Sequence, residues 1–114
     1  MVPIPILMKS GYETFDFLVD TGADCSIIPK RVASDLDVDL SRLPRLHFRG
    51  IGGSSIAAYV TKITIKIGDH PLGITCVLSD NEQNLFILGR KDIFPKFNIL
   101  FDNENGMIGF SLIK

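Results

Sequence analysis

The clearest pattern along the chain is an alternation of apolar and polar side chains within residues 60–67, which read VTKITIKI. Ile63, Ile65 and Ile67 alternate there with Lys62, Thr64 and Lys66. Because successive side chains of a strand point to opposite faces, a period of two predicts a strand with one buried face.

Turn-forming residues divide much of the remaining chain into short apolar segments. Residues 9–11 (KSG), 68–71 (GDHP) and 103–106 (NENG) each lie between two such segments. Each of these arrangements predicts a hairpin. Several short strands at this spacing predict a closed or sandwiched all-β domain. The flanking segments are residues 12–19, 72–78, 97–101 and 107–113.

Two segments could form short helices. Residues 30–36 carry three apolar side chains after Pro29 and could make a turn or two, and residues 90–94 after Gly89 could form another short helix. With 114 residues, the chain is long enough for one hydrophobic core but not for two. We therefore expect a single domain over residues 1–114.

Composition and charge narrow the classes of protein. Hydrophobic residues make up 46% of the chain, which favours a folded domain over disorder. The formal net charge of -1 argues against a general binder of nucleic acid or anionic membranes. No apolar run reaches the length of a membrane span. The start MVPIPILM has two prolines and no basic residue, so it is a poor signal peptide, and we expect a cytoplasmic protein.

The cysteines and histidines give no sign of a metal site. Cys25 and Cys76 match neither a disulfide framework nor a zinc-ligand spacing. We interpret them as ordinary thiols in a reducing compartment, and a single disulfide stays open as an alternative. His47 and His70 are isolated in the sequence. The sequence therefore predicts no metal and no cofactor.

Asp20 is a carboxylate within the apolar stretch FDFLVDTGADCSIIP at residues 15–29. Burying an unpaired charge is costly, so its position needs an explanation. Gly22 permits a tight loop, and the hydroxyl of Thr21 can bond to the backbone and fix that loop. The pattern predicts a rigid loop at a strand end that partly shields the carboxyl group. The alternative is an Asx-turn that merely ends the strand.

Two further segments carry distinctive glycines. Residues 48–55 (FRGIGGSS) lack the following helix and the Lys-Ser/Thr ending of a phosphate loop, which argues against a nucleotide site. A hairpin tip suits this segment better. Residues 86–90 (FILGR) form an apolar strand that ends at a glycine with a cation beyond it.

In this order along the chain, these elements resemble the retropepsin-like aspartic proteases, which are single-domain relatives of pepsin. Residues 20–24 (DTGAD) resemble the catalytic loop, residues 50–53 (GIGG) the flap tip, and residues 87–90 (ILGR) the second hydrophobic-hydrophobic-Gly element. The resemblance implies an all-β, closed, barrel-like acid protease fold with one short helix after Gly89. Residues 97–110 resemble the closing hairpin of cellular relatives, which favours a cellular or prokaryotic member over a viral one.

The resemblance implies an aspartic endopeptidase that hydrolyses peptide bonds. This chemistry needs two facing carboxyl groups that share a proton, one to activate water and one to protonate the scissile carbonyl. The chain has a single Asp-Thr-Gly, so the partner of Asp20 would be Asp20 of a second subunit. The active form would be a homodimer with a two-fold axis through the site.

The resemblance also assigns roles around the loop. Thr21 would lock to the opposite loop across the axis, and Gly22 would accept a hydrogen bond from the substrate backbone. Ala23 and Asp24 would line the groove, and Asp24 would form a structural ion pair with Arg90. The flap tip would close over an extended peptide, and apolar side chains would line its pockets. The residues implied to bind substrate are Ala23, Asp24, Ile27, Gly50, Ile51, Gly52, Gly53, Leu85 and Ile87.

The sequence departs from several viral relatives near the flap, where Arg49 replaces a glycine and residues 54–55 (SS) replace a bulkier apolar continuation. Two alternatives stay open at this point. One is a catalytically inactive dimerisation or peptide-binding module that keeps the protease fold, although a damaged triplet or missing flap would be its mark and both are intact here. The other is an enzyme processed from a larger precursor.

Overall fold

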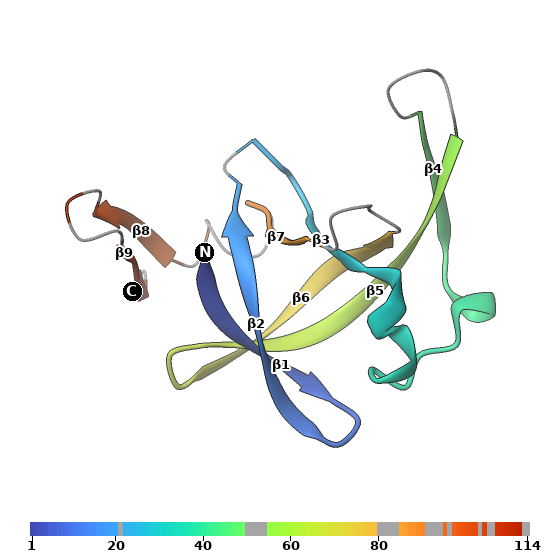
Figure 1. Cartoon of the computed structure of the whole chain (residues 1–114), viewed down its shortest axis with the longest axis horizontal. Helices are drawn as coiled ribbons and strands as arrows, with labels where there is room; N and C mark the ends of the chain where they lie inside the picture. Colours follow the sequence, from blue (N-terminus) through green and yellow to red (C-terminus); the bar gives the residue numbers. More distant parts are fainter. Residues whose placement is uncertain are drawn as a thin grey trace.

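The computed structural model describes most of the chain as strands (Figure 1). The described residues are 1–20, 22–49, 55–79, 85–90, 95, 97–102, 104 and 107–112. The strands are β1 (Val2–Met8), β2 (Gly11–Val19), β3 (Ser26–Pro29), β4 (Arg45–Arg49), β5 (Ser55–Ile67), β6 (His70–Ser79), β7 (Phe86–Leu88), β8 (Phe97–Asp102) and β9 (Met107–Leu112), and the 3-10 helices are η1 (Lys30–Ser34) and η2 (Leu40–Arg42).

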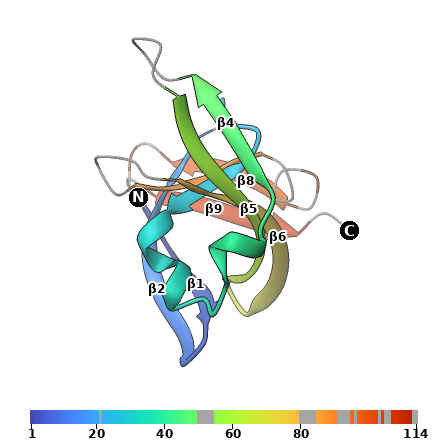
Figure 2. The same cartoon turned by 90° about the vertical axis from the view of Figure 1, so that its right-hand side faces the viewer.

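The main sheet closes on itself. Its strand order is β1-β2-β7-β3-β6-β5-β4, and an additional pairing of β1 with β5 at Ile6 and Ile65 closes the barrel. Strand β4 lies outside this closure and, among the described residues, pairs with β5 alone, so these two strands extend from the barrel as a long hairpin (Figure 2). The closed all-β fold expected from the sequence is confirmed.

The alternation at residues 60–67 lies within β5, as predicted. Ile63 and Ile65 are buried, and they pair with Ile74 and Leu72 of β6, which are also buried. Apolar residues therefore share one face of both strands. The connecting turn is shorter than the four residues expected, because β6 already begins at His70.

The core fills the interior of the barrel. The ring of Phe86 in β7 stacks on Phe15 of β2 with centroids 4.5 Å apart and meets the edge of Phe17 at 5.4 Å. Aromatic pairs of this kind add to the hydrophobic burial that holds β7 beside β2. Among the described residues, the core side chains with at most 1% exposure are Ile4, Ile6, Phe17, Ile28, Ala58, Ile65, Cys76, Leu78 and Leu88.

Short 3-10 turns follow β3. The segment expected to make a turn or two at residues 30–36 forms η1, and it buries Val32 and Ala33 against the core. Helix η2 was not expected from the sequence. Its first turn is capped by Asp39, whose carboxylate accepts hydrogen bonds from the Ser41 N–H at 3.0 Å and the Ser41 hydroxyl at 2.7 Å. The helix expected after Gly89 falls mainly on residues 91–94, outside the described part of the chain.

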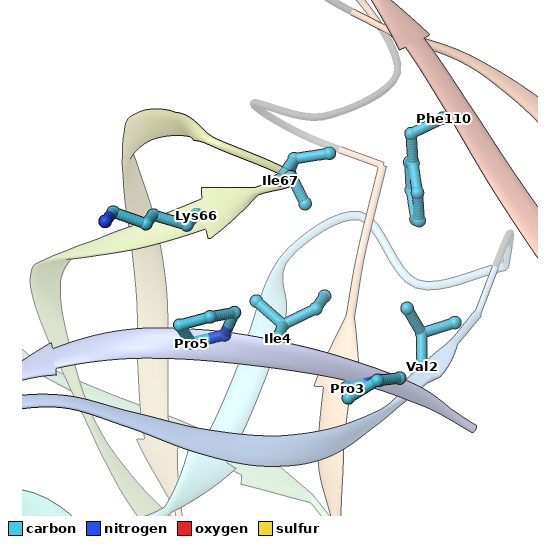
Figure 3. Close-up of a pocket in the computed structure, with 8 residues that line it drawn as sticks. Val2, Pro3, Ile4, Pro5, Lys66, Ile67 and Phe110 are labelled. Carbon is cyan, nitrogen blue, oxygen red and sulfur yellow. The ribbon is translucent and has the colours of Figure 1, made fainter.

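The terminal strands β8 and β9 pair as the expected antiparallel hairpin, and Phe110 of β9 packs against the barrel core. Phe110 also lines a cavity of about 220 Å³ beside β1 and the end of β5 (Figure 3). Strands β1 and β5 pair only at Ile6, and Pro3 and Pro5 have no N–H to extend the pairing. The cavity lies where the two strands separate.

Both cysteines are free thiols, so the disulfide left open by the sequence is absent. Cys76 is fully buried, and this burial raises the pKa of its thiol to about 12. In the parts of the chain that the structure describes, no helix has both the length and the apolar character needed to cross a membrane.

Candidate active site

Asp20 lies directly after β2, half-buried, where the backbone leaves the strand. Its N–H donates to the carbonyl of Leu88 in β7 at 3.1 Å, and its own carbonyl accepts from the Ala23 N–H at 3.2 Å. Its carboxylate oxygen Oδ1 accepts from the Gly22 N–H at 2.9 Å. These contacts hold both the backbone and the carboxyl group of Asp20.

The bond from Gly22 to the Asp20 carboxylate is the contact that defines an Asx-turn. The Asx-turn, which the sequence left open as an alternative to a catalytic loop, is therefore present. It fixes the direction of the carboxyl group. A Cβ atom on residue 22 would lie 3.3 Å from Oδ1 of Asp20, which is tighter than most contacts of this kind. Glycine lets the backbone approach the carboxylate this closely.

The end of β7 binds the loop that follows Asp20. The Arg90 N–H donates to the carbonyl of Ala23 at 2.8 Å, and the Gly89 N–H donates to the Ser26 hydroxyl at 3.1 Å. A Cβ atom on Gly89 would overlap the carbonyl group of Cys25 and lie 3.0 Å from the carbonyl oxygen of Ala23. Only glycine lets β7 lie this close to the loop.

Asp24 and Arg90, which the resemblance pairs, are in contact. Arg90 Nη2 donates to Asp24 Oδ1 at 2.6 Å, and the two side chains are 53% and 79% exposed respectively. Ion pairs this exposed contribute about 0–1 kcal/mol, because water screens them. Within one chain, the pair orients these side chains more than it stabilises the fold.

An apolar row crosses the barrel next to Asp20. Ile27 of β3 pairs with Ile87 of β7, and both are half-buried. Leu18 of β2 pairs with Ile87 from the other side, and Val77 of β6 pairs with Ile27. Since the alternate residues of these strands, such as Ile28, point into the core, the row lies on the opposite face.

Sequence reasoning missed Leu18, which is 42% exposed although it is large and apolar. A signal was available, because an exposed leucine two residues before Asp20 breaks the expected polar face of β2.

Leu85, one of the predicted pocket residues, lies half-buried directly before β7. The remaining predicted site residues fall outside the described residues: Thr21, Gly50, Ile51, Gly52 and Gly53.

Comparison with known proteins places this geometry in context. A sequence model of the aspartyl protease family matches residues 5–91, which include Asp20, the flap segment and Arg90. A search of curated proteins finds no match.

Solved structures with a similar fold include three proteases or protease-like domains. A retropepsin-like aspartic protease from Rickettsia conorii has a TM-score of 0.67 and 19% identity, covering 95% of this chain and 80% of that one. The retroviral protease-like domain of Ddi1 from Leishmania major has a TM-score of 0.64 and 15% identity, covering 99% and 90%. The EIAV protease, solved with the inhibitor HBY-793, has a TM-score of 0.53 and 24% identity, covering 78% and 81%. At these identities the likeness establishes a retropepsin-like fold.

Proposed function

Because the chain belongs to the aspartyl protease family, we propose that it is an endopeptidase whose active site forms between two copies of the chain. In this proposal, residues 1–114 act as one domain, and Asp20 of each copy supplies one carboxyl group. The enzyme needs no metal or cofactor. It would act in the cytoplasm on peptide or protein substrates, and its free thiols suit a reducing compartment.

The observation that carries the proposal is the way Asp20 is held. A carboxyl group fixed by the Gly22 N–H, on a loop attached to β7 through Leu88, is preorganised for chemistry. A residue that only ended a strand would need the Asx-turn but would not need an apolar row beside it. The half-exposed row of Leu18, Ile87 and Ile27 gives an extended substrate an apolar surface next to that carboxyl group.

The chemistry requires the second copy. Two carboxyl groups that face each other across a two-fold axis cannot both ionise readily, so the pair shares one proton and titrates in two coupled steps. The ionised group takes a proton from a water molecule, which attacks the scissile carbonyl carbon. The protonated group donates to the carbonyl oxygen. A monomer holds only half of this arrangement, so activity should rise with dimer formation.

The substrate would bind as an extended strand over the apolar row. Ile27, Ile87 and Leu85 are the pocket residues implied by the resemblance, and Leu18 joins them by its pairing with Ile87. Ala23, Asp24 and the flap tip at residues 50–53 would complete the groove. We therefore expect apolar side chains on both sides of the cleaved bond.

Cleavage of a mixed peptide library tests the proposal. The purified chain is assayed from about pH 4 to pH 7 at increasing protein concentration, beside Asp20→Asn. We expect cleavage that the variant loses while its far-ultraviolet circular dichroism stays unchanged. Cleavage by Asp20→Asn at the wild-type rate would refute the assignment. No cleavage by the wild type at any concentration would instead favour an inactive peptide-binding or dimerisation module.

A further inference from the structure

Ser26 makes a buried contact that the proposed chemistry does not use. It is the first residue of β3 and is only 5% exposed. Its hydroxyl oxygen accepts a hydrogen bond from the Gly89 N–H at 3.1 Å, which joins two residues 63 positions apart in the chain. A buried N–H group without a partner is costly, so this hydroxyl satisfies a group that β7 would otherwise leave unpaired.

Gly89 lies in the middle of the attachment between β7 and the Asp20 loop. On one side of it, the Leu88 carbonyl accepts from the Asp20 N–H, and on the other side the Arg90 N–H donates to Ala23. Because these three residues are consecutive, a displacement of Gly89 moves both neighbouring contacts. Ser26 supplies the hydroxyl group that holds the central residue, Gly89, through its N–H.

We propose that Ser26 is a positioning residue for Asp20 and acts through Gly89 and the carbonyl of Leu88. This inference rests on the proposed function for its catalytic consequence, although the structural link stands independently. Two carboxyl groups that must share a proton tolerate little displacement, and a misplacement of about 1 Å can cost about a hundredfold in rate. The Ser26 hydroxyl keeps the loop and β7 in register so that Asp20 meets its counterpart.

Three substitutions at position 26 separate this role from simple packing. Ser26→Ala removes the acceptor, Ser26→Thr keeps a hydroxyl, and Ser26→Cys keeps the approximate size with a weaker acceptor. Thr61→Val is the matched control. Within the described part of the chain, Thr61 is the other buried polar residue, and it lies in the same row as Ser26, two strands away across Cys76.

The first readout does not depend on activity. In ¹⁵N-labelled protein, Ser26→Ala should speed hydrogen exchange of the Gly89 amide by about tenfold or more, because its acceptor is lost. The ¹³C chemical shift of the Asp20 carboxyl group, measured at one fixed pH, should change with it. Thr61→Val should leave both signals as in wild type. Unchanged exchange at Gly89 and an unchanged Asp20 carboxyl shift in Ser26→Ala would overturn the proposal.

The second readout is kinetic. Ser26→Ala should lower kcat by about 10- to 100-fold with KM within about threefold, since the apolar binding row is untouched. Ser26→Thr should recover most of the lost kcat, and Thr61→Val should keep wild-type values. A kcat unchanged in Ser26→Ala despite faster exchange at Gly89 would show that the contact does not position Asp20.

Two outcomes keep this inference separate from the proposed function. If the wild type cleaves no peptide, the proposed function fails, while the exchange rate of Gly89 and the chemical shift of the Asp20 carboxyl group still decide whether Ser26 holds Gly89 and Asp20. If Ser26→Ala does not fold, Ser26→Cys takes its place and should give an exchange rate between those of wild type and an unprotected amide. A Cys variant identical to wild type in Gly89 exchange, Asp20 carboxyl shift and kcat would also overturn the proposal.

Discussion

Replacing Gly89 by alanine should unfold the attachment between β7 and the Asp20 loop. The added Cβ would overlap the Cys25 carbonyl, and because backbone atoms cannot rotate away, β7 or the loop must move. Movement breaks the hydrogen bonds from the Gly89 and Arg90 N–H groups to Ser26 and Ala23. Each lost bond costs about 0.5–1.5 kcal/mol, and an orphaned buried donor costs about 1–3 kcal/mol.

The orphaned Gly89 donor, the lost Arg90 bond and about 1–3 kcal/mol of overpacking strain together give a loss of roughly 3–7 kcal/mol in the free energy of unfolding. For a domain of this size, that corresponds to a fall in Tm of about 10–30 °C. The assay is thermal unfolding by circular dichroism at one fixed protein concentration, because a dimer's Tm depends on concentration.

Gly73→Ala is the matched control for Gly89→Ala. A Cβ on Gly73 would meet nothing within 4 Å, so this variant should unfold within a few degrees of wild type. A Gly89→Ala protein with the Tm of Gly73→Ala and full peptidase activity would refute the reasoning.

Three other predictions concern the thiols, the η2 cap and the ion pair. Burial raises the pKa of Cys76 to about 12, so N-ethylmaleimide at pH 8 should label the half-buried Cys25 and spare Cys76 in the folded protein, as read by mass spectrometry; equal labelling would contradict this. Hydrogen bonds from the Ser41 hydroxyl and N–H lower the pKa of Asp39 below its ordinary 3.8. The ionised Asp39 carboxylate therefore stabilises the fold at neutral pH, and this contribution is lost as the pH falls below 3.8 through the lowered pKa. Ser41→Ala should raise the Asp39 midpoint in a ¹³C titration, and an unchanged midpoint would exclude the cap as its cause. Asp24→Ala should lower the stability of one chain by less than about 1 kcal/mol yet weaken the dimer in sedimentation, and an unchanged dimer with unchanged activity would count against its supporting role.

Much of the fold could be predicted because its signals are local. The period of two at residues 62–67 and the turn residues at 9–11 and 68–71 predict strands without reference to distant contacts. The strand limits were less accurate, since β5 begins at Ser55 and β6 at His70. Pairing with a neighbour extends a strand past the point where its own alternation stops.

The contacts that hold the site could not be read from local pattern. Strand β7 lies parallel to β2, and β3 lies parallel to β6, so neither pair comes from a hairpin turn. The sequence indicates that Asp20 and Gly89 are unusual, but not that Ser26 is the acceptor for the Gly89 N–H. Leu18 stands out locally as a large apolar residue on the polar face of β2, but its row with Ile87 and Ile27 exists only once the strands are assembled.

The central claim is that each active site uses Asp20 from two copies of the chain. Wild-type protein and Asp20→Asn are mixed in equal amounts, unfolded in urea and refolded together, and peptidase activity is compared with wild type at the same total concentration. If both aspartates are required, only about one quarter of the random dimers are active, so activity should fall to about one quarter. Activity of about one half would mean that each copy works alone and would contradict the account.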